Sequence, residues 1–135
     1  MMIFLDTNIL VYATVNQDAA KQKISENIVS ENIGGNLVIS PLILSEYVYV
    51  MAKLGIDESY VRKSVDLFRK CVYSNIDVEL VYSSFLLGQK IKMNKNINDL
   101  MHLKYAEKYA KVIYTFDDNF KKLAKHSSID IKILK

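Results

Sequence analysis

The sequence predicts an α/β protein in which helices flank a largely parallel β-sheet. Short, continuously apolar runs recur along the chain, and such runs are typical of strands buried on both faces. Longer stretches with helical periodicity separate them, and this alternation is the pattern of a parallel sheet. Four glycines and one proline in 135 residues favour long helices, and the length fits one domain spanning residues 1–135.

The first half of the chain predicts two strands and four helices. Residues 2–5 form the first apolar run, after which Thr7 or Asn8 can cap a short helix through about residue 12. A periodic stretch at 18–32 predicts a helix that two glycines end. A second strand at 37–39 precedes Ser40 and Pro41, a cap and first-turn pair that opens a helix to residue 55, and Asp57 caps the next helix.

The second half predicts three more strands, at 78–81, 112–115 and 131–134. We expect a helix beginning at Ser83 or Ser84 and fading at 94–96. Asn98 is placed to cap a helix over 99–111, and a short helix is expected at 120–125. The sheet would then have about five strands.

Two acidic residues follow predicted strands directly. Asp6 comes after the first apolar run, and Asp117 comes one residue after the strand at 112–115. Ligands of such sheets collect outside the carboxyl ends of the strands, so both side chains are expected at one rim. Each residue could instead simply cap the helix that follows it, and Asp118 could do so in place of Asp117.

Two further acids lie on predicted helices. Residues three and four positions from Glu46 are all apolar or aromatic, so Glu46 is expected on an inward face, where it needs a cation or a lysine partner. Asp99 stands in the first turn of its helix, where an acid is also ordinary capping.

Clustered carboxylates repel one another unless a cation lies among them, and Mg²⁺ and Mn²⁺ prefer oxygen ligands. Zinc is disfavoured, because the chain has one cysteine and its two histidines lack the spacing of zinc ligands. His102 is expected along its helix, at the surface or beside the acids.

The chain resembles PIN-domain ribonucleases, most closely the toxin subunit of VapBC-type toxin–antitoxin pairs. Four segments carry the resemblance in the family's order: FLDTNILVYA at 4–13, SPLILSEYVY at 40–49, NDLMHLKYA at 98–106 and IYTFDDNF at 113–120. The resemblance implies a PIN-like three-layer sandwich and a divalent-metal-dependent RNA endonuclease that uses Mg²⁺ or Mn²⁺. It also implies a cognate antitoxin and a homodimer.

The same resemblance implies the site residues. The family's acidic quartet falls on Asp6, Glu46, Asp99 and Asp117, with Asp6 and Asp99 as the foremost metal ligands, and its orienting polar residues fall on Asn8 and Thr115. Many members have another aspartate where this chain has Asn119, and Asp118 could substitute for it.

Other functions remain open at this point. A haloacid-dehalogenase-type phosphatase would need an aspartate where Asn8 stands. A PIN-fold nuclease in RNA processing, or an inert RNA- or protein-binding module on the same scaffold, would share the fold. The helix expected at 41–55 is apolar on more than one face, which favours a self-association surface or an antitoxin groove.

The composition indicates a soluble, cytoplasmic protein. The single Cys71 excludes an internal disulfide, and the sequence has neither an apolar run of membrane-spanning length nor a signal peptide. The net charge of +3 leans weakly toward a polyanionic partner. Five lysines near the acids could hold RNA phosphates or simply be solvated: Lys90, Lys92, Lys95, Lys121 and Lys122.

Overall fold

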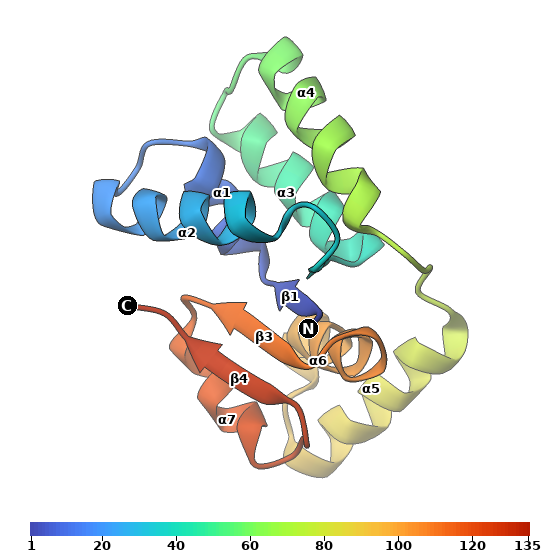
Figure 1. The fold of residues 1–135 in the computed structure, drawn as a ribbon. Coiled ribbons are helices and arrows are strands. Elements are labelled where there is room, and N and C mark those ends of the chain that lie inside the picture. Colours follow the sequence, from blue (N-terminus) through green and yellow to red (C-terminus); the bar gives the residue numbers. More distant parts are fainter.

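A four-stranded parallel sheet forms the centre of the fold (Figure 1). The computed structural model describes all 135 residues. The strand order is β2 (Leu37–Val38), β1 (Ile3–Leu5), β3 (Val112–Thr115) and β4 (Asp130–Ile133). β1 lies between β2 and β3, with Phe4 opposite Val38 on one side and Ile113 on the other. Because β1 and β3 are neighbouring parallel strands, their carboxyl ends lie at the same edge.

Seven helices flank this sheet, which confirms the predicted α/β class. They are α1 (Thr7–Thr14), α2 (Ala19–Asn32), α3 (Pro41–Lys53), α4 (Glu58–Phe68), α5 (Val78–Ile91), α6 (Ile97–Tyr109) and α7 (Lys121–Ala124). Figure 1 shows α1 to α4 gathered on one side of β1 and α5 to α7 on the other. None of these helices has the length and apolar character that crossing a membrane requires.

The caps predicted at Ser40 and Asp57 are confirmed, and Asp18, which was expected only as the start of its helix, is a third cap. The Asp18 carboxylate accepts from the backbone N–H groups of Ala20 and Lys21, and Ser40 Oγ accepts from the Ile43 N–H at 3.0 Å. Asp57 caps α4 in the same way. Each cap satisfies backbone donors that the first turn leaves free, and contributes about 1 kcal/mol.

The prediction for 78–84 was wrong. Residues 78–81 are the first turn of α5, and the helix begins at Val78 rather than at Ser83 or Ser84. Asp77 caps this helix by accepting from the Leu80 N–H at 2.9 Å. The sheet therefore has four strands, because this apolar run packs as a helix against α6.

Two other helix starts also differ from the prediction. Asn96, not Asn98, precedes α6. At α1 the cap is Asp6, one of the expected candidates, rather than Thr7 or Asn8. The single-turn 3₁₀ helix Asp118–Phe120 leads into α7, so the helical segment near the C-terminus begins before residue 120.

The core lies between the sheet and the inward faces of α1, α3 and α6. Its largest fully buried side chains include Phe4, Tyr47, Tyr105 and Phe120. Burial of a side chain of this size contributes about 1.5–3 kcal/mol. The Tyr47 hydroxyl donates to Thr14 Oγ1 at 3.0 Å, so α3 is tied to α1. The packing holds the strand ends and the two helices beside them in fixed positions.

Candidate active site

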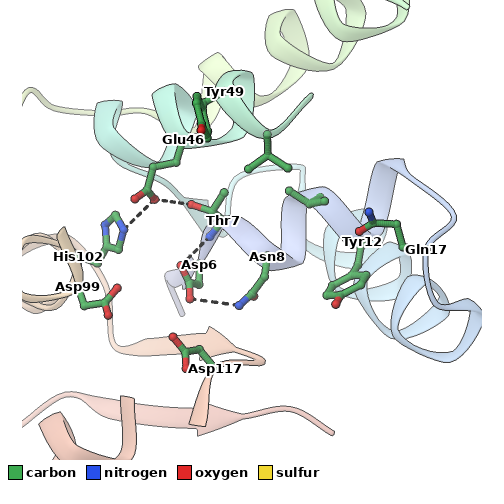
Figure 2. A pocket seen from close by; sticks show the side chains of 12 residues that line it. Asp6, Thr7, Asn8, Tyr12, Gln17, Glu46, Tyr49, Asp99, His102 and Asp117 are labelled. Carbon is green, nitrogen blue, oxygen red and sulfur yellow. Dashed lines mark hydrogen bonds and ion pairs between the residues drawn. The ribbon is translucent and has the colours of Figure 1, made fainter. Parts of the chain in front are cut away.

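An open pocket of about 450 Å³ lies at the carboxyl ends of β1 and β3 (Figure 2). The four acids singled out from the sequence, Asp6, Glu46, Asp99 and Asp117, all line it. They come from the end of β1, from α3, from the first turn of α6 and from the segment after β3. The fold thus brings together four carboxylates that are far apart in the sequence.

Asp6 is the most buried of the four, with 7% of its surface exposed. Its Oδ1 accepts from the Thr7 N–H at 2.8 Å, and its Oδ2 accepts from Thr115 Oγ1 at 2.6 Å. Burial raises the pKa of Asp6, while the hydrogen bonds and the nearby His102 work against that rise. The capping role anticipated for Asp6 therefore holds, and the same carboxylate also lines the pocket.

Asn8 and Thr115 hold the Asp6 carboxylate in place. Thr115 is fully buried, and its Oγ1 accepts from the Asp117 N–H at 3.0 Å while donating to Asp6. The Asn8 amide nitrogen lies 3.4 Å from Asp6 Oδ2, and its Oδ1 accepts from the Phe116 N–H at 3.3 Å. These bonds join the start of α1 to the end of β3 at the floor of the pocket.

Glu46 is held by three hydrogen-bond donors from two other elements. Its Oε1 accepts from Thr7 Oγ1 at 2.6 Å and lies 3.0 Å from His102 Nε2, and its Oε2 accepts from the Asn98 amide at 3.3 Å. Burial by itself raises the pKa of Glu46, but the hydrogen bonds and the positive charge that His102 can carry outweigh it, so the pKa lies below its ordinary value. Glu46 is therefore ionised at neutral pH, and its partner is a histidine rather than a lysine.

His102 is buried beside the acids, so of its two expected positions the one at the surface was wrong. Only 1% of its side chain is exposed, its ring lies 5.9 Å from that of Phe4, and its Nδ1 has no hydrogen-bond partner. Thr7, Asn98 and His102 were not among the predicted site residues. For His102 a signal existed, because its spacing of three from Asp99 places both on one face of α6.

The pKa of Asp99 is raised as well. Burial is the main cause that raises the pKa of its carboxyl from 3.8 to about 6, and the charges of Asp6, Asp117 and Glu46 add to the rise, whereas His102 opposes it. The charges act because the carboxylates face one another across the pocket. Any cation placed among them would therefore be favoured.

Of the three polar residues 117–119 that follow β3, only Asp117 lines the pocket. Asp117 lines the pocket, and its Oδ1 accepts from the Asn119 N–H at 2.9 Å. Asp118 lies outside the pocket with 78% of its side chain exposed, 3.5 Å from Lys121. Asn119 is exposed and contributes only its backbone. None of the five lysines that were expected near the acids lines the pocket.

The pocket fits a hard divalent cation in the chemistry of its donors. It offers four carboxylates and no thiolate, and oxygen ligands are those that Mg²⁺ and Mn²⁺ prefer. The side chains as they stand do not form a closed coordination shell, since no three Asp, Glu, His or Cys groups are close enough to hold an ion. Mg²⁺ commonly keeps several waters and binds through one or two carboxylates, and this pocket can supply them.

Comparison with known proteins identifies a family and a solved structure that are similar to this chain. The model of the PIN domain family matches residues 3–126. Among solved structures, a chain in the crystal structure of VapBC2 from Rickettsia felis bound to a DNA fragment from their promoter is similar, with a TM-score of 0.70, 19% identity and 100% of both chains covered. At that identity the similarity shows a shared fold. A search of curated protein sequences gave no match.

Proposed function

The chain belongs to the PIN-domain family, and on that basis we propose that it is a divalent-metal-dependent RNA endonuclease, the toxin component of a type II toxin–antitoxin pair. The observation that carries the proposal is the convergence of Asp6, Glu46, Asp99 and Asp117 on one pocket. The similarity to a chain of the VapBC2 structure supports the toxin assignment.

The chemistry follows from the state of each carboxylate. A bound Mg²⁺ or Mn²⁺ would lower the pKa of a coordinated water and neutralise charge on the phosphate. Asp6 and Asp99 are the foremost ligands. Thr115 and Asn8 orient the Asp6 carboxylate. The Asp99 carboxylate makes no hydrogen bond that a cation would have to break. Asp117 would bind the ion directly or through water. Glu46, kept ionised by its three donors, would bind the ion, or orient or deprotonate the attacking water.

We also propose two protein partners, an antitoxin and a second copy of the chain. An apolar groove of about 550 Å³ lies between α3 and α4, lined in part by Val48, Ala52, Ile56, Val61 and Val65. A groove of this kind suits the apolar face of a helix. Cys71 is a buried free thiol, which supports a reducing, cytoplasmic location.

A cleavage assay tests the enzymatic proposal. The wild-type chain should cut a single-stranded RNA in Mg²⁺ or Mn²⁺ and should be inactive with a chelator. Asp6→Asn should lower the rate on the order of a hundredfold or more, because the remaining carboxylates cannot position the cation. Asp130→Asn, which changes an exposed acid on β4, is the matched control and should keep full activity. Cleavage that persists in Asp6→Asn, or without metal, would contradict the proposal.

A further inference from the structure

The pocket has two chemically different ends. Figure 2 shows Asp99 and His102 at one end and Tyr12 and Gln17 at the other, with Tyr49 on the α3 side. No lysine or arginine lines the pocket. An RNA phosphate approaching the carboxylates therefore meets negative charge, and a substrate needs additional attractive contacts beside the acids.

Lys21 supplies a cation next to the pocket. Its Nζ lies 5.2 Å from the ring centroid of Tyr12 and 5.4 Å from that of Phe116, and these two rings meet edge to face at 5.3 Å. The Asn8 side chain, which also holds Asp6, accepts from the Phe116 N–H, so this cluster is joined to the floor of the pocket. The ammonium group is positioned by aromatic faces.

Lys21 forms no ion pair with an acidic side chain. The nearest acid in sequence, Asp18, uses its carboxylate on the backbone N–H groups of Ala20 and Lys21. The aromatic contacts place the ammonium group without using its N–H donors, which stay available for an anion.

Tyr49 is an aromatic surface at the rim. It lines the pocket three residues after Glu46 on α3, and 67% of it is exposed. Its hydroxyl has no hydrogen bond and its ring has no aromatic partner within the chain, in contrast to Tyr47 beside it, which is buried and has both. An unpartnered ring in this position is suited to stack on a nucleobase.

We propose that Tyr49 and Lys21 form a subsite for the strand that flanks the scissile phosphate, with Tyr49 stacking on one of its bases and Lys21 Nζ binding one of its phosphates. The inference rests on the proposed function, because it takes the acidic end as the place of cleavage. The contact requires an unpaired base, since the bases of a duplex are already stacked on one another and cannot lie against Tyr49.

Binding of a labelled RNA tests the subsite separately from catalysis. The probe is a short, fluorescein-labelled single-stranded RNA without self-complementarity, and anisotropy is measured in the Asp6→Asn background. Tyr49→Ser should weaken binding on the order of tenfold, and Tyr49→Phe should restore it. The same change at Tyr73, which is 53% exposed and away from the pocket, is the control and should have no effect. The duplex form of the probe should not distinguish Tyr49→Ser from its parent.

Salt dependence tests Lys21. Loss of one phosphate contact to a single strand should reduce the slope of log affinity against log salt by about 0.7 in Lys21→Met. Lys23→Met removes an exposed lysine of the same helix and should leave the slope unchanged. Equal effects of Lys21→Met and Lys23→Met would overturn the subsite, because they would indicate diffuse attraction by surface charge.

The remaining outcomes separate the subsite from the proposed function. If wild-type protein cuts RNA but Tyr49→Ser binds the probe as tightly as its parent, the subsite is wrong and the nuclease stands. If Tyr49→Ser weakens binding but the wild-type protein cuts nothing, the RNA contact of Tyr49 stands, and the nuclease and the position of the contact beside a cleavage site both fail. If Tyr49→Ser dissociates a dimer in light scattering and leaves RNA binding intact, Tyr49 packs on a second copy and the subsite is wrong.

Discussion

Replacement of Asp99 by asparagine should stabilise the metal-free protein at neutral pH while removing its activity. Asp99 is held among three other acids, and burial together with their charges raises its pKa to about 6. The folded chain therefore has to keep an unfavourable negative charge above that pH. Asparagine has nearly the same shape and no charge, so it removes the penalty along with the metal ligand.

The magnitude follows from the change in pKa. The interval from 3.8 to about 6 corresponds to roughly 3 kcal/mol at 1.36 kcal/mol per pKa unit. Asp99 is only partly buried, so solvent screening reduces the expected gain in the free energy of unfolding to about 1–2 kcal/mol.

The dependence of stability on pH is a second test of whether Asp99→Asn raises the free energy of unfolding. The folded state binds the Asp99 proton more tightly than the unfolded state does, so this group lowers the free energy of unfolding as pH rises from about 3.8 through about 6. The advantage of Asp99→Asn should be full above about pH 6 and should shrink toward zero as pH falls to 3.8.

Denaturant unfolding in chelator, over a pH series, measures this difference. Asp130→Asn is the control, and as an exposed substitution it should stay within about 0.5 kcal/mol of wild type at every pH. Added Mg²⁺ or Mn²⁺ should stabilise the wild type more than Asp99→Asn. An Asp99→Asn protein that is no more stable than wild type at neutral pH, or whose advantage persists at low pH, would refute the reasoning.

Three further outcomes are expected. Asp117→Asn should slow RNA cleavage at least about tenfold more than Asp118→Asn, because only Asp117 faces the pocket; the reverse order would move the fourth acid to Asp118. Gly88→Ala should lower the free energy of unfolding by about 1–3 kcal/mol in denaturant unfolding. The added methyl group would lie 2.9 Å from Leu100 Cδ1 and closer still to the Asn94 side chain, so the packing of α5 against α6 would have to shift. An unchanged unfolding midpoint would mean that α5 and α6 are loosely packed. Light scattering of the purified chain should report about twice the 15.5 kDa monomer mass, and a monomer at micromolar concentration would exclude the homodimer.

The fold was predictable where the signals were local. The caps at Ser40 and Asp57 involve residues three positions apart, so a single stretch of sequence contains the whole interaction. The run at 78–81 failed because four apolar-rich residues suit a buried strand as well as a helix. Asp77, the residue that decides the matter by capping α5, was available in the sequence.

The site was predictable to the extent that topology determines it. Asp6 and Asp117 follow neighbouring parallel strands, and the apolar neighbours of Glu46 orient it inward, so their convergence could be anticipated. The sequence did not allow the partner of Glu46 to be predicted, because His102 lies 56 residues away and contacts Glu46 only when α3 packs beside α6. The choice between Asp117 and Asp118 likewise depends on how the chain leaves β3, which the sequence does not show.

Diffraction from crystals soaked in Mn²⁺ tests most directly whether the four carboxylates form one metal site. We expect an anomalous peak in the pocket, within ligand distance of Asp6 and Asp99, and its loss in Asp6→Asn crystals of unchanged fold. A peak elsewhere on the chain, or none in the pocket while the crystals take up Mn²⁺, would contradict the metal-dependent site.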